Sequence, residues 1–208
     1  MQDLETIGVV PVVVLDNLSH ASPLGDALVE GGLACAEVTL RTEASLEIIA
    51  TLSRRGDMLI GAGTVLSIRQ ADLAIDAGAH FLVSPGFDRD VVAYAQLRGI
   101  PVLPGIASAT EVQAAMRMGL EHLKFFPAIP AGGLPMLSAL HGPFPTVRFM
   151  PTGGIALDSL EGYITHPAVF AVGGSWMVPR SKLEAGEFEL VMELTRSTVA
   201  HMTTLRVG

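Results

Sequence analysis

The sequence predicts a single α/β domain in which parallel strands and their covering helices form a (β/α)8 TIM barrel. Short apolar runs alternate along the 208 residues with amphipathic stretches, at a nearly constant spacing. Such alternation is typical of a parallel sheet covered by helices. Eight strand–helix units close naturally into a barrel. A doubly wound open sheet uses the same alternation, but the count of units and the lack of a full G-x-G-x-x-G after the first strand favour the barrel.

The predicted strands are short runs rich in Val, Ile and Leu, and the helices between them have one apolar face. In several helices the last turn runs into glycine, the usual C-terminal stop. The domain is predicted to span residues 1–208. In chain order the strands are expected at 9–15, 35–40, 58–63, 81–85, 101–106, 122–127, 148–153 and 169–174, and helical patterns include 45–55, 68–78, 88–99 and 110–119.

The composition excludes several classes of protein. Half of the residues are apolar and 16% are charged, as in a dense globular protein. The net charge of −8 and the lack of a basic run argue against nucleic-acid binding. Cys35 is the only cysteine, which excludes an internal disulfide and a CxxC motif. Residues 1–15 do not resemble a signal peptide, and no apolar run approaches the ~18 residues of a membrane helix. We therefore expect a cytoplasmic protein with no membrane partner.

A lysine inside an apolar strand is the first candidate for chemistry. Lys124 is one of only two lysines, and it lies between Leu123 and Phe125 in the sixth predicted strand. A buried lysine is costly unless it is paired. The alternatives are a structural ion pair or a side chain that reaches out to solvent. A desolvated lysine can become a neutral amine that attacks a carbonyl carbon and forms a Schiff base.

The second predicted strand supplies a candidate acid. Glu37, Thr39 and Arg41 are spaced by two, which places them on one face of a strand. If Glu37 and Lys124 both point inward, a carboxylate that relays protons lies beside the amine. The alternatives are a core carboxylate paired with an arginine for Glu37, and a position on the barrel rim for Arg41.

The remaining strand ends also carry polar or small residues, where barrel active sites lie. Thr64 follows the third strand and the fourth strand ends in Ser84-Pro85, although Thr64 or Pro85 alone is typical of a turn. The last two strands end in PTGG (151–154) and VGGSWM (172–177). Adjacent glycines let backbone N–H groups approach an anion, and Ser175 adds a hydroxyl. Two such loops in these places predict a phosphate site, although each alone could be a tight turn.

Other catalytic motifs are absent from the sequence. The six histidines show no H-E-x-x-H or other metal spacing, so metal-dependent aldol chemistry is disfavoured. GGSWM is not a G-x-S-x-G elbow, and there is no P-loop. We predict neither a metal site nor an organic cofactor.

Six motifs in register carry a resemblance to a known family. EVTLRT (37–42), GAGTV (61–65), SPG (84–86), KFFPA (124–128), PTGGI (151–155) and GGSWMV (173–178) resemble the 2-keto-3-deoxy-6-phosphogluconate (KDPG) aldolases, the lysine aldolases of the Entner–Doudoroff route. The resemblance runs from about residue 7 to 190. Its members often also act as 4-hydroxy-2-oxoglutarate (KHG) aldolases.

The resemblance implies a role for each matching residue. It implies that Lys124 forms the Schiff base and that Glu37 is the general acid and base. It further implies a homotrimer that cleaves KDPG to pyruvate and glyceraldehyde 3-phosphate and KHG to pyruvate and glyoxylate. The other implied positions are Arg41, Thr64 and Pro85 at the pyruvate carboxylate, Phe126 beside the substrate, and Thr152, Gly153, Gly154, Gly174 and Ser175 at the phosphate end of the site.

Three alternative functions remain open from the sequence. An aldolase for the C4 epimer, 2-keto-3-deoxy-6-phosphogalactonate, would differ only in the stereochemistry that it accepts at one hydroxyl. A phosphate-binding barrel isomerase or synthase would share the late glycines without needing Lys124 as an imine former. A non-catalytic sugar-phosphate binding protein would bind phosphate and form no covalent adduct.

Overall fold

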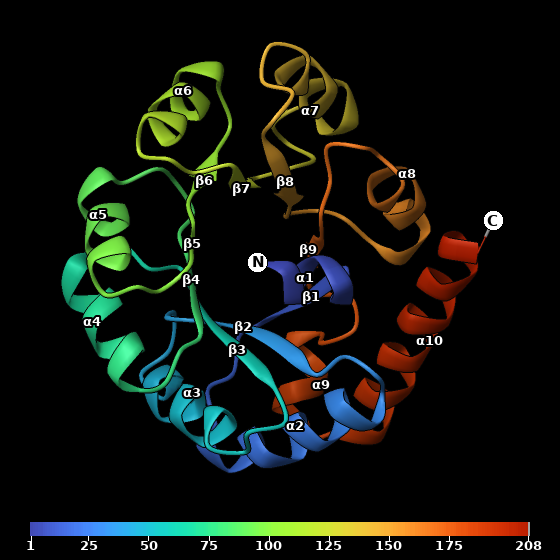
Figure 1. The fold of residues 1–208 in the computed structure, drawn as a ribbon. Coiled ribbons are helices and arrows are strands. Elements are labelled where there is room, and N and C mark those ends of the chain that lie inside the picture. Colours follow the sequence, from blue (N-terminus) through green and yellow to red (C-terminus); the bar gives the residue numbers. More distant parts are fainter. Residues whose placement is uncertain (208) are drawn as a thin grey trace.

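The computed structural model describes the backbone of residues 1–207 and the side chains of residues 1–205. Figure 1 shows the strands at the centre of the molecule, with helices arranged around them. The strands are β1 (Val9–Val13), β2 (Cys35–Thr39), β3 (Leu59–Gly63), β4 (Phe81–Val83), β5 (Val102–Leu103), β6 (Gly105–Ile106), β7 (His122–Phe125), β8 (Arg148–Pro151) and β9 (Val172–Gly174). The α-helices are α1 (Gln2–Ile7), α2 (Ala21–Glu30), α3 (Ser45–Ser53), α4 (Ile68–Asp76), α5 (Arg89–Leu97), α6 (Ala109–Arg117), α7 (Gly133–His141), α8 (Leu160–Ile164), α9 (Arg180–Glu184) and α10 (Phe188–Val207), with short 3-10 turns η1 (Leu18–His20) and η2 (Leu157–Ser159).

The strands form a curled, wholly parallel sheet in two sections. The larger section has the order β5-β4-β3-β2-β1-β9, and the smaller has the order β6-β7-β8. Every pair of neighbouring strands in these sections is parallel. The predicted α/β alternation is therefore confirmed, and the strands end near the predicted positions.

The fifth predicted strand is divided where Pro104 interrupts it. β5 pairs with β4, and β6, on the other side of Pro104, pairs with β7. Proline has no N–H to donate to a strand ladder, but the Pro104 carbonyl accepts a hydrogen bond from the Lys124 N–H at 3.0 Å. The segment 102–106 therefore connects the two sections of the sheet on one side.

Two isolated bridges join the sections on the other side. Phe149 of β8 pairs with Val169, and Thr152 pairs with Gly173 of β9, both in the parallel sense. The backbone N–H of Phe149 donates to the Ala168 carbonyl at 2.7 Å. These contacts bring the ends of β8 and β9 side by side, which positions the two glycine-rich loops of the candidate site.

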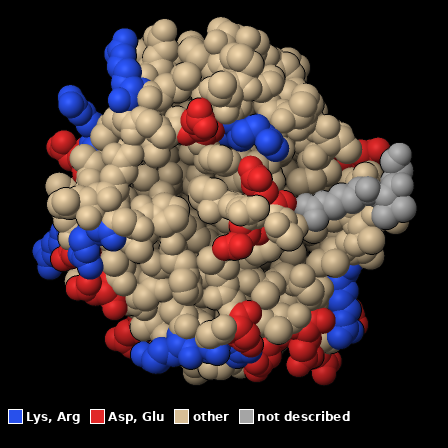
Figure 2. All heavy atoms as spheres, viewed as in Figure 1, with Lys and Arg blue, Asp and Glu red and all other residues tan. Residues whose placement is uncertain are grey.

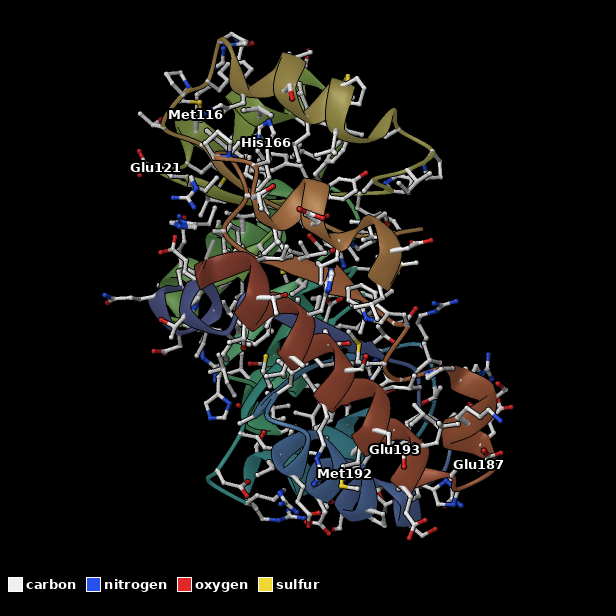
Figure 3. The ribbon with its side chains drawn as sticks, turned by 90° about the vertical axis from the view of Figure 1, so that its right-hand side faces the viewer. Met116, Glu121, His166, Glu187, Met192 and Glu193 are labelled. Carbon is white, nitrogen blue, oxygen red and sulfur yellow. The ribbon has the colours of Figure 1, made fainter. Side chains whose placement is uncertain are left out.

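The apolar core has an outer and an inner part. The outer cluster fills the space between strands and helices, and a smaller cluster is made largely of strand residues, among them Val10, Cys35 and Met150. Leu4 of α1 belongs to this smaller cluster and is 1% exposed. Figures 1 and 3 together show α1 lying across one open side of the curled sheet, whereas α9 lies on the opposite side. The helix α1 was not predicted, and it covers the side from which the strands start.

The surface carries its charges mainly over the helices. Figure 2 shows Lys, Arg, Asp and Glu side chains mostly around the periphery of the face that α1 covers, with a smaller mixed group near its centre. Among the described residues, no helix combines the length and the apolar character that a membrane crossing needs.

Candidate active site

A buried ion pair joins the two residues that the sequence singled out. Lys124 lies in β7 and is 5% exposed, and Glu37 lies in β2 and is fully buried. The Lys124 Nζ donates to Glu37 Oε1 at 3.0 Å and lies 3.4 Å from Oε2. Among the side chains described, this is the one ion pair whose two members are both buried. The solvent-reaching alternative for Lys124 is therefore wrong, and Glu37 is paired with lysine rather than arginine.

Two glycines that sequence reasoning did not select allow close contacts here: Gly63 makes room for Glu37, and Gly105 makes room for the backbone of Pro85. A Cβ at Gly63 would lie 2.3 Å from Glu37 Oε1, so any side chain on β3 there would displace the carboxylate. Gly105 is the register partner of Lys124, and a Cβ there would lie 2.1 Å from the Pro85 carbonyl oxygen. The pattern GAG shows that the third strand contains Gly61 and Gly63. It does not show which side chain of a neighbouring strand would clash with a Cβ at either position.

Phe126 follows β7 and packs beside the ammonium group. The Lys124 Nζ lies 5.3 Å from the centroid of the Phe126 ring, within the range of a cation–π contact. The same ring approaches Gly153, where a Cβ would lie 3.3 Å from Phe126 Cε2. Phe126 thus lies near both the lysine and the first glycine-rich loop, and its place beside the substrate stays a prediction.

The three residues expected at the pyruvate carboxylate lie at different depths. β2 ends at Thr39, so Arg41 lies in the turn after the strand, exposed, rather than on the strand face shared by Glu37. Thr64 directly follows Gly63 and has a φ of 57°. A β-branched residue is an outlier in this left-handed region, and such strain clusters at functional sites. Pro85 is half-buried against Gly105.

The structure brings most of the expected phosphate-binding residues together. Thr152 is 5% exposed and pairs with Gly173, the neighbour of Gly174. Gly153 and Gly154 have φ angles of 107° and 84°, which other residues rarely adopt. Ser175 is exposed, and within residues 1–205 neither its hydroxyl nor the Arg41 guanidinium has a hydrogen-bond or ion-pair partner. The roles of all these residues stay predictions.

Cys35 lies in the same strand as Glu37, two residues earlier, and is completely buried. Burial raises the pKa of its thiol far above the ordinary value, and the charge of Glu37 raises it further. Because the thiolate is the reactive form, this thiol is inert in the folded protein.

An amine and a carboxylate held together out of water can exchange a proton over 3.0 Å. The amine can then attack a carbonyl carbon, and the carboxylic acid can return the proton to a leaving oxygen. The first glycine-rich loop passes the Phe126 ring at Gly153. This arrangement suits a substrate with a ketone at one end and an anionic group at the other.

Comparison with known proteins identifies the class to which this arrangement belongs. A family model described as KDPG and KHG aldolase matches residues 1–194. A 2-dehydro-3-deoxy-phosphogluconate aldolase of Treponema pallidum is 50% identical over 94% of each chain. A KHG/KDPG aldolase of Escherichia coli is 42% identical over 94% of this chain and 92% of its own. The crystal structure of a KDPG aldolase from Legionella pneumophila, with pyruvate captured as a covalent carbinolamine, has a TM-score of 0.89 and 43% identity, over 92% of this chain and 93% of its own.

The fold, the buried amine–carboxylate pair and these relatives define an aldolase, which is a lyase. Within that class, the chain belongs to the KDPG and KHG aldolase family. The resemblance found in the sequence is thereby confirmed, and the isomerase, synthase and non-catalytic alternatives are set aside.

Proposed function

We propose that this chain is a metal-independent Schiff-base aldolase that cleaves KDPG to pyruvate and glyceraldehyde 3-phosphate. The observation that carries the proposal is the buried contact between the Lys124 Nζ and Glu37 Oε1. A lysine and a carboxylate enclosed together are the two groups that imine chemistry needs. The covalent pyruvate in the Legionella relative supports the same chemistry here.

The reaction begins when Lys124 gives a proton to Glu37 and its neutral Nζ attacks the C2 ketone. A proton moves from Nζ to the C2 oxygen and gives the neutral carbinolamine. The protonated Glu37 then gives its proton to the carbinolamine hydroxyl, which leaves as water, and an iminium forms. Glu37 then removes the C4 hydroxyl proton, directly or through water. The electron pair of the C3–C4 bond moves into the iminium, and glyceraldehyde 3-phosphate leaves. The remaining enamine is protonated at C3, and hydrolysis releases pyruvate and regenerates Lys124.

The other residues orient the substrate in this proposal. Arg41, Thr64 and Pro85 hold the pyruvate carboxylate, and Phe126 packs against the carbon chain. The unpaired guanidinium of Arg41 supports its role, because a guanidinium without an acidic partner is free to bind a carboxylate. The phosphate is held by the loops of Thr152, Gly153, Gly154, Gly174 and Ser175.

Cleavage of KHG to pyruvate and glyoxylate is the second proposed activity. The Escherichia coli relative is named for both substrates, and it is 42% identical to this chain. The Schiff-base steps use only the keto acid and the C4 hydroxyl, which both substrates share, so the same pair can act on either.

We further propose that the chain forms one domain with a complete (β/α)8 barrel and assembles as a homotrimer. The barrel is supported by the hydrogen bonds of segment 102–106 to both sections of the sheet and by the two bridges at β8 and β9. The trimer is implied by the family, and apolar side chains are exposed at and before α4: Leu66 is 58%, Ile68 44% and Leu73 43% exposed.

Trapping with borohydride tests the Schiff base. After incubation with pyruvate and borohydride, we expect mass spectrometry to find one reduced adduct on the peptide that contains Lys124. Lys124→Ala should lose both the adduct and measurable aldolase activity. Lys182→Ala removes the other lysine, which is exposed and paired with Glu187, and should retain both. An adduct on Lys182, or substantial turnover by Lys124→Ala, would refute the proposed mechanism.

Replacing Glu37 separates proton transfer from binding. Glu37→Gln keeps the shape of the side chain but removes its proton-accepting oxygen. We expect kcat to fall about 10²- to 10⁴-fold, the range for general acid–base groups, with little change in pyruvate affinity. A kcat close to that of the parent would show that another group moves the proton.

A coupled assay with the two phosphorylated sugar acids settles the substrate. We expect higher kcat/KM for the gluconate than for the C4-epimeric galactonate, because the relatives at 42–50% identity described above are named for the gluconate. A preference for the galactonate would overturn the substrate while leaving the Schiff-base chemistry intact.

A further inference from the structure

A cavity outside the candidate active site is lined by two arginines. It has a volume of about 230 Å³ and is formed by Phe87, Arg89, Ala114, Arg117 and Met118. Arg89 is the first residue of α5, whereas Ala114 and Arg117 lie on α6, which ends beside Met118. The residues that line the cavity include no acidic side chain, and Arg89 and Arg117 are both exposed.

Within residues 1–205, these two arginines belong to a group without ion pairs that also includes Arg41 and Arg69, whereas three other arginines pair with carboxylates. The chain has 21 acidic and 13 basic residues, and Arg55, Arg98 and Arg180 each pair with two carboxylates. Within residues 1–205, neither the Arg89 nor the Arg117 side chain takes part in an ion pair or a hydrogen bond.

The nearby acidic side chain of Asp88 is used elsewhere, because its Oδ1 accepts from the backbone N–H groups of Asp90 and Val91 at the start of α5. Among the described residues, no ion pair joins Asp88 to Arg89 or Arg117.

The floor of the cavity is apolar and firmly held. Phe87 and Met118 are partly buried and pack against the main core. The Met118 carbonyl also accepts a hydrogen bond from the Gln96 side chain at 2.8 Å, which fixes the end of α6 to α5. A ligand here would place a small apolar body on Phe87 and Met118 and its charge between the arginines.

We propose that this cavity binds a small organic phosphate monoester. Each guanidinium presents a planar fork of N–H donors, and a phosphate monoester offers three oxygens and close to two negative charges at pH 7. A single carboxylate has two oxygens, which one fork satisfies, so two arginines from different helices suit phosphate better. The volume is below the 300–1,000 Å³ typical of drug-sized ligands, which restricts the ligand to a small molecule. This site is separate from the aldolase chemistry and does not depend on it.

Methyl NMR of the intact protein with phenyl phosphate as the probe tests the proposal. Met118 lines the cavity, whereas Met116 lies on the same helix outside it. With ¹³C-methyl methionine, we expect the Met118 resonance, assigned with Met118→Leu, to shift saturably while that of Met116 moves much less. The Met118 response reports this cavity alone, even if phenyl phosphate also binds at the candidate active site.

Matched arginine variants decide between a specific site and general charge attraction. Arg89→Gln and Arg117→Gln should each weaken the Met118 response roughly tenfold or more, the loss expected for a hydrogen bond to a charged group. Arg69→Gln removes the same charge from an exposed arginine of α4 and should leave the response unchanged. A Met118 resonance that does not saturate, or equal affinity in all three variants, would overturn the site. Borohydride trapping at Lys124 would be unaffected by either result.

Discussion

At the scale of single residues, the candidate site depends on Gly63, which has no side chain. Gly63 is where β3 passes the Glu37 carboxylate, and a Cβ there would lie 2.3 Å from Oε1 and 2.7 Å from Cγ. Real Cβ atoms do not approach so closely, so one of the two must move. Because the Lys124 Nζ donates to the same Oε1, a shift of the carboxylate also changes that contact.

The variant Gly63→Ala should therefore impair the proposed proton transfers. We expect a fall in kcat and a loss of about 1–3 kcal/mol in the free energy of unfolding, the usual cost of adding bulk to a packed core. Enzyme assays and urea unfolding measure the two effects. Gly142→Ala is the control, because a Cβ there meets its nearest atoms at 3.8 Å. Unchanged kcat in Gly63→Ala would show that Glu37 has room to relax.

Thr64 illustrates the opposite case, a side chain retained at a strained backbone angle. At a φ of 57°, asparagine is better tolerated than threonine. We expect Thr64→Asn to raise the free energy of unfolding by about 1 kcal/mol and to lower kcat/KM, since the proposed carboxylate contact is altered.

Thr203→Asn, at an exposed helical position whose hydroxyl bonds the Val199 carbonyl, should give no such gain. Stability and kinetics that fall together in Thr64→Asn would contradict the strain argument.

Sequence reasoning identified Lys124 and Glu37 because each is a charged residue within an apolar, strand-like run, where burial of a charge is costly. It placed Arg41 on the strand face because alternation gives no sign of where a strand stops, and β2 stops at Thr39. It did not select Gly63, because the need for glycine arises from a side chain 26 positions away. These outcomes separate what local pattern determines from what contacts across the sheet determine.

At the scale of elements, the connection between α8 and β9 is held by a histidine. His166 Nδ1 accepts from the Ala168 N–H at 3.1 Å, and its Nε2 lies 2.9 Å from the Ser138 hydroxyl of α7. Figure 3 shows His166 between α7 and α8. The Nδ1 contact requires that nitrogen to be unprotonated, so the neutral ring fits this position. Burial lowers the pKa of His166 below its ordinary 6.5, and nearby His141 lowers it further.

This histidine should make the protein less stable in mild acid. Above pH 6.5 the ring is neutral in both states, and its contribution to stability is complete. As the pH falls below 6.5, the unfolded chain takes up the proton before the folded one, so the free energy of unfolding decreases with falling pH.

Urea unfolding at several pH values should show a shallower decrease for His166→Gln than for the parent. His20→Gln, whose ring contacts the Leu183 carbonyl, serves as the control. Parallel pH profiles for parent and His166→Gln would remove His166 as the cause.

The elements themselves were largely predictable. The eight predicted strands and the four helices predicted at 45–55, 68–78, 88–99 and 110–119 lie near observed elements, whereas no ranges were predicted for α2, α7, α8, α9 and α10. The fifth strand was predicted as one run over 101–106, but Pro104 divides it, because proline cannot donate to a ladder. The helix α1 was missed because Gln2–Ile7 is too short for its periodicity to be distinguished.

At the scale of the whole molecule, the apolar side chains around the start of α4 lack a cover within the chain. Leu66 and Ile68 are 58% and 44% exposed, and Leu73 of α4 is 43% exposed. Exposed apolar surface of this kind is typical of an interface when several side chains are contiguous. Oligomeric state cannot be predicted from composition or periodicity, so here the family supplied the expectation.

Sedimentation equilibrium should give a mass of about 65 kDa, three times the 21.8 kDa of one chain. Leu66→Glu, which places a charge on the exposed apolar surface, should shift the distribution toward single chains. Leu97→Glu, at the 82% exposed end of α5, is the matched substitution and should leave the mass unchanged. A parent protein that sediments as one chain would refute the trimer.

The single thiol of Cys35 is a natural probe of local unfolding in this molecule. A thiol reagent cannot reach it while β2 is paired on both sides, so the rate of labelling reports how often that strand separates from its neighbours. Glu37 lies two positions further along the same strand, and any event that exposes the sulfur also threatens the enclosure of the ion pair. The rate of labelling in native buffer thus measures how often the strand that carries Glu37, the partner of Lys124, opens to solvent.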